Sequence, residues 1–173
     1  GETWLEARRG EAEELGHTRQ PYVVIVGGGQ GGIGLGARLR QLGVPTIIVE
    51  RNERPGDSWR KRYKSLCLHD PVWYDHLPYI KFPENWPVFS PKDKIGDWLE
   101  MYTRVMELNY WSSTTCRSAS YDENAKEWTV VVDRDRDHVD ALAAQLLPRP
   151  ERGGILHPDP TDALVTQLQD GQR

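Results

Sequence analysis

The chain has 173 residues, a formal net charge of −4 and 38% hydrophobic residues. This length accommodates one ordinary domain with a short extension, and the acidic balance disfavours nucleic acid as a partner because phosphate binding requires a basic face. No run of 18 apolar residues predicts a membrane-spanning helix, and the glutamate-rich N-terminus does not resemble a signal peptide. Cys67 and Cys116 suggest neither a disulfide framework nor a metal site. We therefore expect a soluble, cytoplasmic α/β protein without a bound metal.

The first residues of the chain predict a helix. Thr3 and Glu6 have the spacing of a capping box, in which both side chains accept N–H groups at a helix start. Gly16 is placed to end this helix. We assign residues 1–19 to an N-terminal helical extension at the periphery of the protein.

The next segment predicts two strands with a helix between them. Residues 22–26 form a short β-branched run that stops at glycines, which is typical of a buried parallel strand. Residues 33–42 carry apolar side chains at helical spacing, and Gly43 and Pro45 end that helix. Residues 46–50 predict the second buried strand. This order indicates a right-handed βαβ unit.

The following stretch, residues 51–90, has no clear periodicity and is rich in Trp, Tyr, Pro and Arg. Irregular segments this long are usually functional or disordered, and the aromatic content argues against disorder. Ser90 and Pro91 then predict a helix start. Its buried face is expected to hold Ile95, Trp98, Leu99, Tyr102, Val105 and Met106.

The last elements are short strands followed by a tail. Residues 110–115 predict a third strand, and residues 119–121 and 128–132 predict a hairpin. Residues 134–173 contain no aromatic side chain and four prolines. Such a segment buries too little apolar surface to offset a backbone-ordering cost of about 1–2 kcal/mol per residue. We therefore predict a folded domain over residues 20–133 and a weakly structured tail over residues 134–173.

A glycine loop lies between the first strand and the helix. Gly27 permits the tight turn, Gly29 lets a pyrophosphate approach the backbone, and Gly32 lets the helix pack closely on the sheet. The helix start adds free N–H groups and the positive end of the helix dipole. The pattern predicts a Rossmann-type dinucleotide site formed by Gly27, Gly28, Gly29, Gln30, Gly31 and Gly32.

Glu50 ends the second strand, 18 residues after Gly32. A carboxylate at this point accepts a ribose 2′-hydroxyl and repels a 2′-phosphate, which favours FAD or NAD over NADP at this loop. Methyltransferases that bind an adenosyl cofactor also combine a glycine loop with an acidic strand end. The tight glycine spacing and the long irregular segment that follows count against that alternative.

The residues after Glu50 narrow the choice of cofactor. Residues 56–69 contain the pattern G-x-x-W-R…R-Y…L-x-L-H, and residues 82–87 contain F-P…P ahead of the amphipathic helix. Together with the glycine loop, this combination resembles the flavin-containing monooxygenases, near their Baeyer–Villiger and plant indole-pyruvate branches. The resemblance covers residues 20–133.

This resemblance implies that the βαβ unit binds the ADP part of FAD, with the glycine loop on the pyrophosphate and a carboxylate on the adenosine ribose. Arg51 would then lie beside the adenine. Residues 57–60 would run beside the ribityl-phosphate chain, and His69 and Asp70 would approach the flavin ring. Beyond the glycine loop, the implied contacts are Glu50, Arg51, Trp59, Arg60, His69 and Asp70.

The family chemistry belongs to the cofactor: NADPH reduces the flavin, and one oxygen atom from O₂ is transferred to a small organic substrate. The sequence contains no second glycine loop for NADPH, no F-x-G-x-x-x-H signature and no strand ending in Ala-Thr-Gly after Asp133. We therefore expect an incomplete family fold and assign no catalytic residue. A truncated gene product or a fragment would explain this. The alternatives are a non-catalytic dinucleotide-binding module and an inactive remnant; the oligomeric state stays open.

Overall fold

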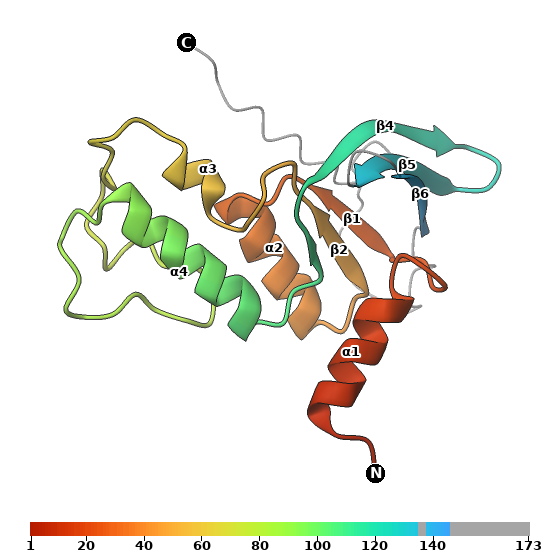
Figure 1. Ribbon diagram of the computed structural model, residues 1–173, viewed down its shortest axis with the longest axis horizontal. Coiled ribbons are helices and arrows are strands. Elements are labelled where there is room, and N and C mark those ends of the chain that lie inside the picture. Colours follow the sequence, from red (N-terminus) through yellow and green to blue (C-terminus); the bar gives the residue numbers. More distant parts are fainter. Residues whose placement is uncertain (135–137, 146–173) are drawn as a thin grey trace, which may run out of the picture.

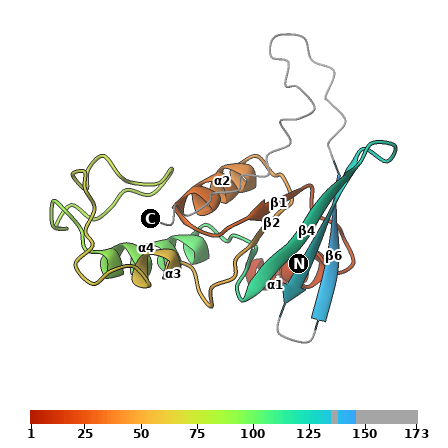
Figure 2. The same cartoon turned by 90° about the horizontal axis from the view of Figure 1, so that it is seen from above.

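A computed structural model describes residues 1–134 and 138–145 of the protein. Two sheets and several helices are arranged in layers, with a parallel sheet between a helical layer and an antiparallel sheet (Figures 1 and 2). The elements in chain order are α1 (Trp4–Glu14), β1 (Val23–Val26), α2 (Gln30–Gln41), β2 (Thr46–Val49), α3 (Asp57–Arg60), α4 (Lys92–Val105), β3 (Tyr110–Trp111), β4 (Thr114–Asp122), β5 (Glu127–Arg134) and β6 (His138–Gln145).

The parallel sheet has the strand order β1-β2-β3. β1 and β2 pair from Val23↔Thr46 to Val26↔Val49, and β3 pairs with the end of β2. All four residues of β2 are buried, as expected for a strand covered on both faces. The α/β class, the Rossmann-type βαβ unit and the parallel sheet are therefore confirmed.

The helical layer covers one face of the parallel sheet. Ile33 and Ala37 of α2 form a buried cluster with four residues of α4, namely Ile95, Trp98, Leu99 and Tyr102. The predicted apolar face of α4 is wrong at Val105, which is 58% exposed. At 3.6 residues per turn, Val105 lies about 70° from the centre of that face, further than any of the others.

The antiparallel sheet, in the order β4-β5-β6, covers the opposite face. Its side chains share one hydrophobic cluster with those of the parallel sheet. The buried members are Leu15, Val24, Ile47, Val49, Trp111, Val130, Val132, Leu142 and Ala144.

The predicted third strand, residues 110–115, is two strands in the structure. β3 belongs to the parallel sheet, and β4 begins the antiparallel sheet. Between them, Ser113 adopts a left-handed conformation (φ 51°) and its N–H donates to the carbonyl of Asn52 (2.8 Å). Thr114 N–H then donates to the carbonyl of Glu50 (2.8 Å). The chain therefore changes sheets at a turn fixed by backbone hydrogen bonds to the segment after β2.

The predicted hairpin is present, with Tyr121 opposite Trp128, and it is extended by a third strand. β6 lies within the segment for which weak structure is expected. β5 already presents an apolar face, so Leu142 is fully buried and Ala144 nearly so. These two buried side chains, two positions apart, pack on the same face of the sheet and account for the position of β6. Residues 135–137 and 146–173 lie outside the described part of the chain, and the domain boundary at residue 133 stays a prediction.

The N-terminal helix α1 begins with the predicted capping box, in which Thr3 and Glu6 accept each other's backbone N–H groups. None of its residues is buried, although Leu15 directly after it is. Among the described residues, no helix has the length and apolar character required to cross a membrane.

Candidate functional site

The glycine loop follows the carboxyl end of β1. Gly27 has a left-handed φ of 107°, and its N–H donates to the carbonyl of Val49 on β2 (2.9 Å). A Cβ at Gly32 would overlap the Gly27 carbonyl, so only glycine allows this close contact of helix and loop. No acidic side chain lies in the first turn of α2. The positive helix end therefore stays available to an anion.

Gly29 is the N-cap residue of α2 and has a different surrounding. A Cβ built on Gly29 would have one neighbour within 4 Å in the described part of the chain, the Ser58 Oγ at 3.8 Å. Packing inside the protein therefore does not require glycine here. Close approach of an external group to the backbone does, as the dinucleotide interpretation expects.

Glu50, the predicted ribose contact, lies directly against this loop. It is 7% exposed, and its Oε2 accepts the N–H of Gly28 (2.7 Å). Its Oε1 accepts both the N–H and the side-chain amide of Asn52 (2.8 and 2.7 Å). A carboxylate oxygen has two acceptor positions, so Oε2 keeps one for a ribose hydroxyl.

Ser58, in α3, carries a buried hydroxyl that has no hydrogen-bond partner among the described residues. A buried polar group in this condition is costly, and it marks a position where a ligand group would satisfy it. The hydroxyl oxygen lies 3.8 Å from the position of a Cβ built on Gly29, beside the start of α2. The residues around this loop therefore fit a pyrophosphate, which offers acceptors to both the hydroxyl and the helix N–H groups.

A cleft of about 410 Å³ opens beside the loop, within the range of about 300–1,000 Å³ typical of small-molecule sites. Trp59 Nε1 donates to Gln30 Oε1 (3.0 Å), which joins α3 to the first residue of α2 at the cleft wall. Four predicted residues meet here: Gln30, Trp59, His69 and Asp70. The remaining lining residues are Arg62, Leu66, Cys67, Leu68, Asp75, Leu77, Phe82, Ile95, Trp98 and Leu99.

The cleft combines apolar walls with a polar edge that contains Asp70 and Asp75 as well as Arg62 and His69. Burial and the nearby charge of Asp70 raise the pKa of Asp75 above its ordinary value. His69 and Asp70 are themselves exposed. Within residues 1–134 and 138–145, no group of three or more His, Cys, Asp or Glu side chains is arranged to hold a metal ion.

Of the contacts predicted after Glu50, Arg51 and Arg60 do not line the cleft, and only Arg60 is expected near it, since Arg51 is expected beside the adenine. Arg51 is exposed beyond the end of β2. The Arg60 side chain is only 10% exposed and turns toward α4, where it donates to Asp97 (2.9 Å) and Glu100 (2.6 Å). It also pairs with Asp57 (3.2 Å). Burial alone would lower the pKa of Arg60, but these carboxylates outweigh it and raise the pKa above its ordinary value.

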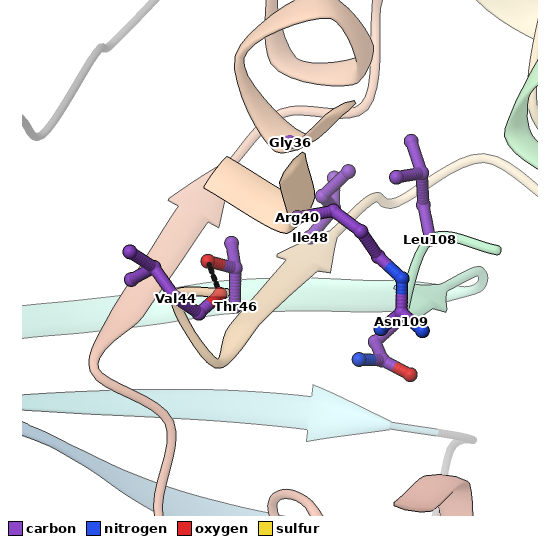
Figure 3. A pocket seen from close by; sticks show the side chains of 7 residues that line it. All are labelled: Gly36, Arg40, Val44, Thr46, Ile48, Leu108 and Asn109. Atoms are coloured by element: carbon purple, nitrogen blue, oxygen red, sulfur yellow. Dashed lines mark hydrogen bonds between the residues drawn. The ribbon is translucent and has the colours of Figure 1, made fainter. Parts of the chain in front are cut away.

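A second, much smaller pocket lies between the end of α2 and β2, lined by Arg40, Thr46 and Asn109 among others (Figure 3). Its volume is about 10 Å³, which is room for a single water. Thr46 Oγ1 donates to the Val44 carbonyl at its rim (2.9 Å). It lies at the opposite end of β2 from the glycine loop and is too small for a nucleotide.

Two residues at the loop, Asn52 and Tyr110, are not singled out from the sequence, and Ser58 is expected only as part of residues 57–60 beside the ribityl-phosphate chain. The Tyr110 hydroxyl donates to the carbonyl of Gly28 (2.8 Å), although the two residues are 82 positions apart. No local pattern could reveal that contact. Asn52 and Ser58 lie within the segment that the resemblance marks, but only the fold shows which way their side chains turn.

No protein-family model matches the chain. Indole-3-pyruvate monooxygenase YUCCA1 of Oryza sativa subsp. japonica is 33% identical over 123 residues, which is 70% of this chain and 30% of that protein. The flavin-containing monooxygenase from Stenotrophomonas maltophilia has the same fold over 72% of this chain and 36% of its own (TM-score 0.64, 24% identity).

The structure of OTEMO in complex with FAD and NADP is also similar, with a TM-score of 0.58 and 22% identity over 72% of this chain and 25% of that one. The chain thus spans about a third or less of the length of these relatives. The sequence identity to the indole-3-pyruvate monooxygenases and the shared fold agree with each other. Over this region, the comparisons support a flavin-containing monooxygenase family for this part of the chain.

Proposed function

We propose that this chain is the FAD-binding part of an NAD(P)H-dependent flavin monooxygenase that inserts one oxygen atom from O₂ into a small organic substrate. One observation carries the proposal: the start of α2, the Glu50 carboxylate and the unpartnered Ser58 hydroxyl converge on one glycine loop. A cleft large enough for an aromatic ring system adjoins that loop. The relationship to flavin monooxygenases supports the same conclusion.

In this proposal the residues of the loop bind the ADP part of FAD. The N–H groups at the start of α2 and the Ser58 hydroxyl donate to the pyrophosphate, which satisfies donors that otherwise have no partner. Glu50 accepts the ribose 2′-hydroxyl through its remaining acceptor position. Arg51, exposed at the end of β2, lies beside the adenine.

The flavin ring then occupies the cleft. Trp59 and Gln30 orient it from the loop side, His69 and Asp70 lie at its polar edge, and the apolar walls exclude water. The bound flavin supplies the redox chemistry of oxygen transfer. The contribution of this chain is to bind and orient that ring, with NADPH as the expected reductant. We also propose a cytoplasmic location, since Cys67 and Cys116 are both free thiols.

The test is a titration of the full purified chain with FAD, followed by flavin fluorescence. We expect Glu50→Ala to weaken FAD binding about tenfold, because a buried charged acceptor and the support of Gly28 are lost together. Glu53→Ala, which removes an exposed carboxylate three residues further on, is the control and should change the Kd by less than about twofold.

Competition with ADP and with FMN shows which part of FAD depends on Glu50. ADP contains the adenosine ribose, so Glu50→Ala should weaken ADP binding by the same factor as FAD binding. FMN lacks that ribose and should be unaffected. Failure of the wild-type chain to bind FAD would contradict the proposed function. Unchanged FAD affinity in a folded Glu50→Ala protein would remove the ribose assignment alone.

A further inference from the structure

Gly28, the second residue of the glycine loop, is held from two sides. Its N–H donates to Glu50 Oε2 (2.7 Å), and its carbonyl accepts the Tyr110 hydroxyl (2.8 Å). Glu50 follows β2 and Tyr110 begins β3, so neighbouring strands supply the two contacts. The backbone N–H and carbonyl of Gly28 are thereby both fixed to residues of the sheet or directly after it.

The Tyr110 contact also determines where the next N–H points. The structure has no cis peptide among its described residues, and in a trans peptide the C=O of one residue and the N–H of the next point in opposite directions. The Gly28 carbonyl points to Tyr110, which packs against the hydrophobic cluster of α2 and α4. The N–H of Gly29 therefore points away from the Tyr110 hydroxyl. As the N-cap N–H of α2, it has no intrahelical acceptor.

Tyr110 and Gly28 fit each other closely. A Cβ at Gly28 would overlap the Tyr110 hydroxyl and approach its ring carbons to 2.6 Å or less. Burial, with the nearby charges of Glu50 and Asp57, raises the pKa of Tyr110. The hydroxyl thus remains protonated and acts as a donor throughout the neutral range.

We propose that Tyr110 is a positioning residue for the cofactor: it fixes the Gly28–Gly29 peptide and so directs the Gly29 N–H toward the pyrophosphate. This inference rests on the proposed function of the loop. Tyr110 acts through Gly28 and does not itself touch the ligand. A residue on the third strand of the sheet thereby completes a site whose sequence pattern ends at the second.

The first experiment compares two Tyr→Phe variants of the full chain. Tyr110→Phe keeps the ring and removes one hydrogen bond, and we expect FAD and ADP to bind about five- to tenfold more weakly. Tyr102→Phe is the matched control, because its hydroxyl also donates to a backbone carbonyl, that of Pro78 (2.7 Å). It should lower the melting temperature to a similar degree and change the Kd by less than about twofold.

The second readout uses the ligand-free protein, so that it does not depend on FAD binding. We expect Tyr110→Phe to shift the amide NMR signals of Gly28 and Gly29 and to lower their order parameters, whereas Tyr102→Phe leaves both unchanged. Unchanged amides in Tyr110→Phe would overturn the positioning role even if no FAD binds. Altered amides with an unchanged FAD Kd would overturn its link to the cofactor. Absence of FAD binding by wild type would instead reject the proposed function.

Discussion

The glycine loop and the junction of α3 with α4 contain similar structural features but differ in role. In both, glycine allows two backbones to come into contact: Gly32 against the Gly27 carbonyl in the loop, and Gly56 against the Gly96 carbonyl at the junction. In both, polar side chains are buried beside those glycines. The difference lies in how those polar groups are satisfied.

At the junction, the protein satisfies its own polar groups. The guanidinium of Arg60 is shared among Asp57, Asp97 and Glu100. At the loop, the Ser58 hydroxyl has no partner within residues 1–134 and 138–145, although Ser58 and Arg60 belong to the same four-residue helix. Open donors beside a helix start therefore indicate a binding site, whereas a closed set of ion pairs indicates a structural contact. Family motifs alone do not separate the two.

The largest loss of stability should come from disrupting the backbone contact between Gly56 and Gly96 at the junction. Gly56→Ala places a Cβ into the Gly96 carbonyl and forces alanine into a left-handed conformation (φ 87°). We expect the free energy of unfolding, measured by urea denaturation, to fall by about 3 kcal/mol. Gly43→Ala is the control: Gly43 has a similar φ of 69°, but no described residue lies within 4 Å of an added Cβ, and the change should cost about 1 kcal/mol. Equal losses would show that the close contact is unimportant.

Substitutions of Arg60 and of its neighbour Trp59 should have smaller effects, one on stability and the other on FAD binding. Arg60→Gln leaves the buried carboxylate of Asp57 with weaker partners, and we expect a loss of about 2 kcal/mol in stability with FAD affinity within about twofold of wild type. Trp59→Phe removes the hydrogen bond to Gln30 at the cleft and should do the reverse, weakening FAD about fivefold at nearly unchanged stability. An Arg60→Gln protein that is stable but binds FAD poorly would restore Arg60 as a cofactor contact.

The sequence predicts those parts of the fold and site that depend on neighbouring residues. The βαβ unit, the capping box of α1 and the meeting of Glu50 with the glycine loop follow from local pattern and strand order. The direction of Arg60 does not, because it depends on carboxylates 37 and 40 positions away on α4. Tyr110 is hidden for the same reason. Strand β6 is missed because its few apolar residues are sufficient only against a face that β5 has already formed.

A polar network between α1 and the end of α2 can be compared with the glycine loop and the α3–α4 junction. Glu11 Oε1 accepts Arg40 Nη1 (2.7 Å) and Asn109 Nδ2 (3.0 Å), and Arg40 also pairs with Glu107 (3.3 Å). These groups satisfy one another, as Arg60 and its partners do. The network lies at the end of α2 remote from the glycine loop. It should therefore affect stability and leave FAD binding unchanged.

Burial alone would raise the pKa of Glu11, but the hydrogen bonds from Arg40 and Asn109 outweigh it and hold the pKa below its ordinary value of 4.5. The folded state thus binds this proton more weakly than the unfolded state, so the stabilisation is complete above that value and is lost as the pH falls through the lowered pKa. We expect Glu11→Gln to cost about 0.5–1 kcal/mol at pH 7, since the pair is partly exposed, and to flatten the acid limb of the stability profile. Glu13→Gln, at an exposed position on the same helix, should retain that limb. A Glu11→Gln protein with the wild-type acid slope would show that the network contributes nothing, and that a closed set of partners is a weaker sign of structural role than the α3–α4 junction indicates.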